Sequence, residues 1–311
     1  MIRGRDDGLK TDTARASPFL LGNKTQYARW RALKLSDYPS GAEKLIVEVR
    51  DPAQPTSSER DALLRIVGKT NMVIYRVTQQ TQNKQSVCAV AKHLGLVHLV
   101  DNPFADEDGI TTLKVAPEKA ARGYIPFTDK RLLWHTDGYY NAPKERIGAF
   151  VLHCVVPATH GGDNMLLDPE MVYLRLRDAN PDYVRALMEK DVLTIPANIE
   201  SGVEIRPARV GPVFAVDGTT GALTMRYTAR TRSAHWKQDE ATADAVRMLA
   251  NLMRDDAPDV FNYRLGPGEG IACNNVLHSR SAFTQLATGP CRTLYRARYY
   301  ERIASLREGL M

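Results

Sequence analysis

The chain has few cysteines and no long apolar run, and both absences restrict what it can be. Its 311 residues include four cysteines, and none lies at the close spacing that is typical of zinc sites. These are Cys88, Cys154, Cys273 and Cys291. No apolar stretch approaches the roughly 20 residues of a membrane-spanning helix, and the first residues lack the apolar segment of a signal peptide. We therefore expect reduced thiols, a cytoplasmic location and no membrane partner.

The charge balance is also modest. The chain has 42 Lys and Arg residues against 36 Asp and Glu residues, for a formal net charge of +6. These charges are spread along the sequence, with no basic block or basic-aromatic repeat, so we expect no nucleic-acid partner. A small positive excess suits the attraction of small anions to a cleft. Whether the chain forms a homo-oligomer stays open.

A short motif is the most informative positive feature. His135-Thr136-Asp137 places a histidine and a carboxylate two residues apart, and on a strand such side chains point to the same face. His278, far downstream, supplies a second imidazole. Two imidazoles and one carboxylate can occupy one face of an octahedral metal and leave the opposite face open, as in non-haem Fe(II) oxygenases. The triplet alone is common by chance, so its surroundings have to support this interpretation.

The surroundings of both histidines predict strands. Residues 131–134 are typical of a strand that leads into His135, and Gly138 lets the chain turn or lets another group approach closely. Residues 266–270 are rich in glycine and predict a tight turn into a strand over 271–275, which leads to His278. The two imidazoles are therefore expected at strand ends.

Four blocks of the sequence resemble the taurine dioxygenase (TauD/TfdA) family of Fe(II)- and 2-oxoglutarate-dependent oxygenases. In chain order they are Leu133–Gly138, Gly161–Asn164, Asn274–Thr284 and Arg292–Arg296. Two shorter blocks, Pro212–Asp217 and Met225–Tyr227, resemble the glutarate hydroxylase branch. The resemblance implies a mainly β fold with helical decorations, namely a double-stranded β-helix or jelly-roll barrel of the cupin kind. It also implies a hydroxylase that uses O2.

The resemblance further implies roles for particular residues. His135, Asp137 and His278 would bind Fe(II), and 2-oxoglutarate would chelate the metal and be converted to succinate and carbon dioxide. Arg292 stands where the family has the arginine that pairs with the distal carboxylate of 2-oxoglutarate, and a planar guanidinium suits that carboxylate. Asn164 stands where the family often has a threonine that helps to hold the same carboxylate. The carboxylate of Asp137 argues against the halogenases of this superfamily, which have a small residue there.

The substrate residues are less specific. Arg296 matches the second arginine of the family, which meets the anionic head of taurine, and we expect it to hold a carboxylate or sulfonate. Arg226 and Tyr139 are further candidates for the pocket. Arg298 shares a strand face with Arg296, but it also suits a basic strand that pairs with acidic neighbours. We expect a small anionic substrate, such as an amino acid, a dicarboxylate or a sulfonate.

The remaining pattern predicts one oxygenase domain over residues 25–311, after a polar arm over residues 1–24. Helices are expected at 57–67, 84–94 and 239–254, and two more begin at Asp168-Pro169 and Asn180-Pro181, where a capping side chain precedes a proline. Strands are expected at 72–77, 109–115 and 147–156, and an antiparallel meander at 192–228. Two alternatives stay open, a non-catalytic binding protein and a barrel enzyme that uses another metal without 2-oxoglutarate.

Overall fold

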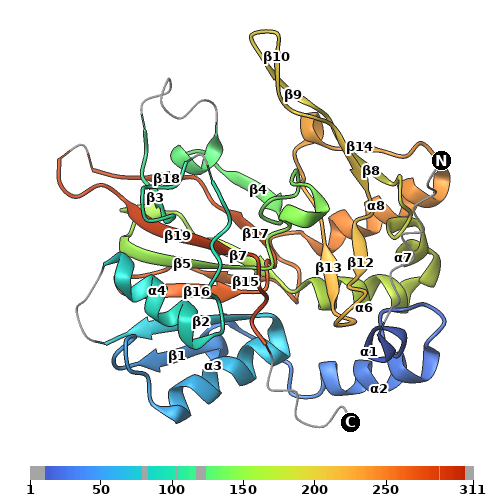
Figure 1. Cartoon of the computed structure of the whole chain (residues 1–311), viewed down its shortest axis with the longest axis horizontal. Coiled ribbons are helices and arrows are strands. Elements are labelled where there is room, and N and C mark those ends of the chain that lie inside the picture. Colours follow the sequence, from blue (N-terminus) through green and yellow to red (C-terminus); the bar gives the residue numbers. More distant parts are fainter. Residues whose placement is uncertain (1–10, 79–82, 103, 117–123, 287, 305–311) are drawn as a thin grey trace, which may run out of the picture. The chain divides into compact units, whose positions relative to one another are not determined.

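A computed structural model describes residues 11–78, 83–102, 104–116, 124–286 and 288–304. The chain divides into two compact units, each made of three segments (Figure 1). Unit 1 comprises the described residues of Met1–Tyr38, Pro169–Arg226 and Ala234–Asn251. Unit 2 comprises those of Pro39–Asp168, Tyr227–Ser233 and Leu252–Met311. The domain boundaries expected from the sequence stay a prediction.

Unit 2 contains a six-stranded sheet. Its order is β1 (Ile46–Val49), β2 (Met72–Val77), β16 (Glu269–Cys273), β5 (Ala149–Val156), β19 (Thr293–Tyr299) and β3 (Thr111–Leu113). The first pair is parallel and the other pairs are antiparallel. Strand β2 has the predicted bounds, and β3 and β5 lie within the ranges that the sequence indicated.

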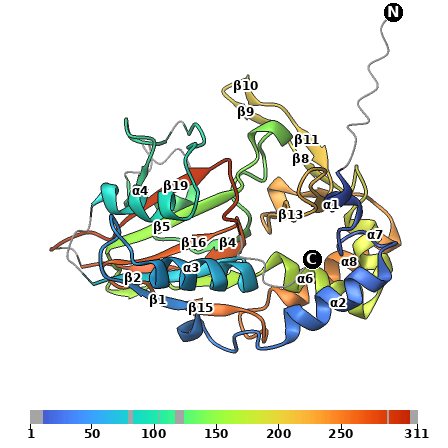
Figure 2. The same ribbon diagram turned by 60° about the horizontal axis from the view of Figure 1, so that its bottom comes forward.

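Helices α3 (Ser57–Thr70) and α4 (Lys84–His93) cover one face of this sheet (Figures 1 and 2). Leu63 and Val67 of α3 recur at helical spacing and join the same buried cluster as Val87 of α4. Burying a side chain of this size contributes about 1.5–3 kcal/mol. Ala297 and Tyr299 of β19 also belong to this cluster. Because strand side chains alternate, the even-numbered residues of β19 lie on the opposite face.

A second, four-stranded antiparallel sheet of unit 2 carries the predicted metal ligands. Its order is β15 (Phe261–Tyr263), β7 (Asn164–Leu167), β17 (Leu277–Arg280) and β4 (Leu132–His135). The register places His278 directly opposite His135. Phe150 of β5 contacts His278, with ring centroids 4.8 Å apart, so the two sheets of unit 2 face each other here. Strand β4 extends one residue beyond the expected range and includes His135 itself.

The other elements of unit 2 are short. They are a two-stranded pair of β6 (His160–Gly161) and β18 (Phe283–Thr284), and the 3-10 helices η1 (Ala42–Leu45), η2 (Ile125–Phe127), η3 (Pro143–Glu145) and η4 (Thr231–Ser233). The sequence of residues 116–130 predicts a loop, which lies partly outside the described residues.

Unit 1 is built from helices and short strands. The helices are α1 (Asp12–Arg15), α2 (Lys24–Leu35), α6 (Pro169–Ala179), α7 (Pro181–Leu187) and α8 (Glu240–Leu252). The strands form three small antiparallel sheets: β11 (Arg209–Gly211) with β8 (Leu193–Ile195) and β14 (His235–Trp236), β9 (Asn198–Glu200) with β10 (Val203–Arg206), and β12 (Phe214–Val216) with β13 (Leu223–Met225). The predicted prolines begin α6 and α7, and the meander is confirmed as this series of short strands.

Part of the segment expected to be a polar arm is packed. Ala14 and Phe19 are buried, and the hydroxyl of Ser17 donates to the carbonyl of Gly221 over 2.7 Å. Residues 1–10 of that predicted arm lie outside the described residues. In the described part of the chain, no helix is both long enough and apolar enough to cross a membrane.

Candidate active site

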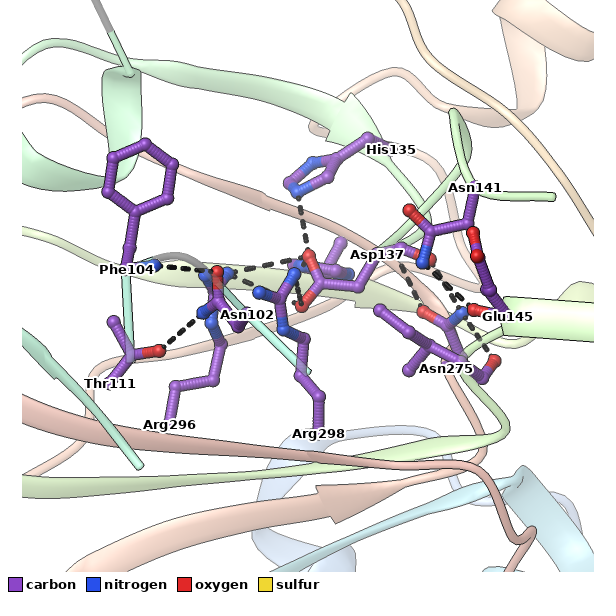
Figure 3. A network of polar contacts seen from close by, with 12 residues as sticks. Asn102, Phe104, Thr111, His135, Asp137, Asn141, Glu145, Asn275, Arg296 and Arg298 are labelled. Atoms are coloured by element: carbon purple, nitrogen blue, oxygen red, sulfur yellow. Dashed lines mark hydrogen bonds and ion pairs between the residues drawn. The ribbon is translucent and has the colours of Figure 1, made fainter. Parts of the chain in front are cut away.

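The three predicted metal ligands converge in unit 2. His135 ends β4, Asp137 follows it by two residues, and His278 lies on the neighbouring strand β17. Nε2 of His135 lies 3.5 Å from Oδ1 of Asp137 (Figure 3). Nε2 of His278 lies 3.8 Å from the same oxygen. One ligand atom from each residue lies within 4.8 Å of the other two. This spacing suits three ligands of a single ion.

Both imidazoles are held in the form that a metal requires. Nδ1 of His135 lies 2.9 Å from the carbonyl oxygen of Leu133, and Nδ1 of His278 lies 2.9 Å from that of Val276. A carbonyl only accepts, so each Nδ1 carries the hydrogen and each Nε2 presents its lone pair. Burial, helped by the nearby His135, lowers the pKa of His278 to about 3. His278 is therefore neutral at physiological pH, which is the form in which an imidazole can bind a metal.

The main chain at Asp137 is held by a residue whose role the sequence did not suggest. Asn275 accepts from the N–H of Asp137 over 2.8 Å and donates to its carbonyl over 2.9 Å (Figure 3). The Asn275 amide also donates to the carbonyl of Ile147 over 3.0 Å. Gly138 turns the chain at φ +67, and a Cβ there would lie 2.8 Å from Ile147. The only hint in the sequence was the pair of asparagines shortly before His278.

The second oxygen of Asp137 faces two arginines. Nη1 of Arg296 lies 3.3 Å from Oδ2, and Nη1 of Arg298 lies 4.0 Å from it. Burial alone would raise the pKa of Asp137, but Arg296, His135 and Arg298 together hold it well below its usual value. Arg296 and Arg298 share the face of β19 opposite the helices, as expected from their spacing. Asp137 is therefore ionised, and its carboxylate lies between two imidazoles and two guanidiniums.

Arg292 lies in a buried, aromatic setting. It is 5 % exposed, and its guanidinium carbon lies 4.7 Å from the centroid of the Phe283 ring. Arg280 lies 4.8 Å from the same ring. Burial lowers the pKa of Arg292 to about 10, and no carboxylate of the described residues forms an ion pair with it. A buried cation without an internal counter-ion suits an anionic ligand.

Arg280 ties the chain before β4 to β17. Its guanidinium donates to the carbonyls of Thr128 and Lys130. Burial is the main cause that lowers the pKa of Arg280 to about 9. The sequence predicts no particular role for Arg280, although it lies within a block that carried the family resemblance.

Two other predicted residues lie in unit 2. Tyr139 approaches His135 edge-on, with ring centroids 6.5 Å apart. Asn164, on β7, is buried, and its Nδ2 lies 3.4 Å from the carbonyl oxygen of Tyr263. Asn164 pairs in register with Arg280. The roles of Tyr139 and Asn164 in ligand binding stay predictions.

Arg226 has a different setting from the one expected. Its guanidinium lies in unit 1 and donates to four main-chain carbonyls, those of Leu193 (2.5 Å), Gly211 (2.8 Å), Pro212 (3.3 Å) and Arg209 (3.3 Å). Burial lowers its pKa to about 10. These contacts give Arg226 a structural role, and the substrate-binding role expected from the sequence stays a prediction.

Comparison with known proteins identifies the family. Residues 32–298 match the family described as taurine catabolism dioxygenase TauD, TfdA family. A uridine-5'-phosphate dioxygenase from Amycolatopsis sp is 30% identical over 174 residues, which cover 54% of this chain and 61% of the relative. The same-named protein from Streptomyces sp is 30% identical over 211 residues, 64% of this chain and 73% of the relative. The match thus spans about three fifths of the Amycolatopsis protein.

The fold also has a solved counterpart. A structure of asparagine oxygenase in complex with Fe(II), 2S,3S-3-hydroxyasparagine and succinate superposes with a TM-score of 0.53 at 17% identity, covering 82% of this chain and 86% of that one. At this identity the likeness shows the fold alone. The family match extends over most of the chain and includes every predicted metal ligand. The chain therefore belongs to the TauD/TfdA family of dioxygenases, and it has the mainly β fold with helices of that family.

Proposed function

We propose that this oxygenase uses Fe(II), 2-oxoglutarate and O2 to hydroxylate an unactivated C–H bond of a small anionic substrate. The observation that carries the proposal is the convergence of two correctly oriented imidazoles on one oxygen of Asp137. We also propose that the strands close into the double-stranded β-helix that the sequence resemblance implied.

His135, Asp137 and His278 are the proposed iron ligands. Their donor set leaves an open face on an octahedral ion, which suits Fe(II) in oxygenases. The hydrogen bonds from each Nδ1 to a carbonyl keep each Nε2 unprotonated and fix the direction of its lone pair. Iron and 2-oxoglutarate, when bound, would supply the oxidising chemistry that breaks the C–H bond, with release of succinate and carbon dioxide.

Arg292 is the proposed partner of the distal carboxylate of 2-oxoglutarate. Its buried guanidinium lacks a carboxylate partner in the described structure and is supported on the Phe283 ring. A bidentate contact with a carboxylate would replace the water that the buried cation has lost. The Asn164 amide is our proposal for a second contact to the same carboxylate.

Arg296 is the proposed partner of the substrate anion, and Tyr139 a proposed wall of the pocket. Arg296 already contacts Asp137, so an anion on its guanidinium would lie beside the metal ligands. The named relatives act on uridine 5'-phosphate, which is also a small anion. Uridine 5'-phosphate is therefore the first substrate to test, ahead of amino acids and sulfonates.

The proposal is tested by anaerobic titration of the purified protein with Fe(II) and then 2-oxoglutarate. We expect the weak visible charge-transfer band of the iron chelate. His135→Ala should lose the band, and Arg292→Ala should need much more 2-oxoglutarate to form it. Arg254→Ala is the matched control, because it removes an exposed arginine that pairs only with Asp256 among the described residues. A wild-type protein with no band at saturating ligand would refute the proposal and favour a non-catalytic role or another metal.

A further inference from the structure

Arg296 and Arg298 form an unusual pair, because two buried guanidiniums share one carboxylate. Their side chains are 11% and 9% exposed, and the ion pairs of both in the described structure go to Oδ2 of Asp137 (Figure 3). The Nε–H of Arg296 is buried and has no hydrogen-bond partner among the described residues. The pair therefore has more positive charge, and more unused donors, than its protein partner can satisfy.

The strand holds both guanidiniums in place. Arg296 and Arg298 pair in register with Leu152 and Phe150 of β5. On the other edge, Arg296 pairs with Thr111 of β3, and the carbonyl of Arg298 accepts from the N–H of Val100 over 2.8 Å. With β19 bonded along both edges, the two guanidiniums are fixed on one face, two residues apart. An anion that contacts one is therefore within reach of the other.

In the proposed function, the charges of these two arginines would exceed the negative charge that remains to balance them. Fe(II) carries two positive charges, which the carboxylate of Asp137 and the chelating carboxylate of 2-oxoglutarate would match. Arg292 would match the distal carboxylate. The remaining guanidiniums, Arg296 and Arg298, would then share, among the described residues, only the Asp137 carboxylate, whose charge is already matched to Fe(II). Uncompensated buried charge is strongly unfavourable.

We propose that Arg296 and Arg298 together bind a dianionic group, and that the substrate is a phosphate monoester. This inference rests on the proposed function and deepens it. A phosphate monoester carries a charge of about −1.5 to −2 at pH 7 and has three acceptor oxygens, enough for both guanidiniums. A sulfonate or a single carboxylate carries one negative charge and leaves one of the two buried cations uncompensated. Arg298, for which the sequence left a structural role open, is thus a substrate-binding residue.

The test compares ligands that differ in the charge of one group. The protein, loaded with Fe(II) and 2-oxoglutarate without oxygen, is titrated calorimetrically with uridine 5'-phosphate and with its methyl diester, which has a single negative charge. A second monoester, ribose 5-phosphate, distinguishes a nucleotide from a sugar phosphate. We expect the better-bound monoester to bind at least about tenfold more tightly than the diester, as the loss of a charge-assisted contact predicts.

The pH dependence of the ligand gives an independent readout. Because the second pKa of a phosphate monoester is about 6, lowering the pH from 7.5 to 5.5 should weaken monoester binding roughly fourfold. The diester keeps its single charge over this range, so it reports any change in the protein itself. A ratio of the two affinities that does not change with pH would contradict binding of the dianion.

Variants of Arg298 then test whether the arginine pair causes the preference for the monoester. Arg298→Gln should remove the preference for the monoester, Arg298→Lys should retain part of it, and the exposed Arg254→Gln should leave it unchanged. A preference that survives in Arg298→Gln, or a loss confined to iron affinity, would overturn the proposal. If Arg298→Gln does not fold, the wild-type comparison of monoester and diester still decides. A normal chelate band without monoester binding would refute this inference alone and leave the proposed function intact.

Discussion

Asn275 holds Asp137 by both of its main-chain polar groups, accepting from the N–H over 2.8 Å and donating to the carbonyl over 2.9 Å. The side-chain amide thus acts on this peptide as a neighbouring strand would. It fixes the direction in which the Asp137 carboxylate leaves the chain, directly after β4. The geometry of the proposed metal site therefore depends on a residue that is not a ligand.

Asn275→Ala should weaken Fe(II) binding by at least about tenfold, because each lost bond leaves a buried main-chain group unsatisfied at a cost of about 1–3 kcal/mol. The measurement is the anaerobic Fe(II) dissociation constant, taken beside the thermal midpoint. The control is Asn274→Ala. Asn274 is similarly buried but bonds to Asn71 and Ile303, so its loss should lower stability and spare iron affinity. Equal iron affinity in both variants would contradict the positioning role of Asn275.

Stability should depend on pH through the start of α3. Thr56 and Glu59 form a reciprocal capping box, and Glu59 also accepts from the N–H of Arg50. That bond to Arg50, with those to Thr56, lowers the pKa of Glu59. Because the folded-state pKa is depressed, the stabilisation is present above the ordinary value of 4.5 and is lost as the pH falls below it.

The expected change in the free energy of unfolding is that caused by the loss of a helix cap. Glu59→Ala should lower the free energy of unfolding by about 1 kcal/mol at pH 7, as measured by urea denaturation. The difference between wild type and Glu59→Ala should shrink when the same titrations are repeated at pH 4 and below. A difference that grows on acidification would show that the ionised form of Glu59 does not provide the stabilisation.

Local signals explain why much of the fold was predictable. Helices α6 and α7 begin at prolines that follow a capping residue, and these signals act within one turn of chain. Strand β2 consists almost wholly of apolar and β-branched residues, which suits a central position in a sheet. The three residues predicted as metal ligands also lie together in the structure. They could be predicted because their chemistry is specific and because a strand fixes the spacing of two of them.

Contacts between distant segments explain what was missed. Asn275 acts on Asp137, 138 positions earlier, and this relationship depends on a loop geometry that no local pattern encodes. An arginine in a matching block suggests an anionic partner, so the sequence predicts substrate binding for Arg226. Its actual partners are carbonyls of two short segments, at residue 193 and at residues 209–212, which only the fold brings together. The surplus charge beside Asp137 likewise depends on which side chains of β19 face β4.

Gly161 should be essential for the proposed 2-oxoglutarate site. It has φ +70, and a Cβ would lie 2.2 Å from the carbonyl oxygen of Ala282, so any side chain must push β6 away from β18. Strand β18 carries Phe283, on which Arg292 lies. We therefore expect Gly161→Ala to raise the 2-oxoglutarate concentration needed for the chelate band by about tenfold, the effect of misplacing one charge-assisted contact.

Gly202→Ala is the matched control for this change. Gly202 has a similar φ of +82, but a Cβ there would meet no atom within 4 Å. Both variants should suffer a backbone penalty of about 1–2 kcal/mol from the left-handed conformation, seen as a lower thermal midpoint. Only Gly161→Ala should change the 2-oxoglutarate requirement. A similar change in Gly202→Ala would mean that general destabilisation, and not displacement of Phe283, is the cause.

Arg226→Lys separates the structural role of Arg226 from the substrate-binding role first expected of it. A lysine keeps the charge, but its single ammonium cannot reach the four carbonyls that the planar guanidinium bridges. Buried carbonyls would lose their donors, so the free energy of unfolding should fall by about 1–3 kcal/mol, measured by urea denaturation. The calorimetric affinity for the phosphate monoester, measured well below the melting temperature, should stay within about twofold of the wild type, because charge is conserved and no proposed substrate contact is changed. The opposite result, normal stability with weakened substrate binding, would support a substrate-binding role for Arg226 and contradict its structural role in unit 1.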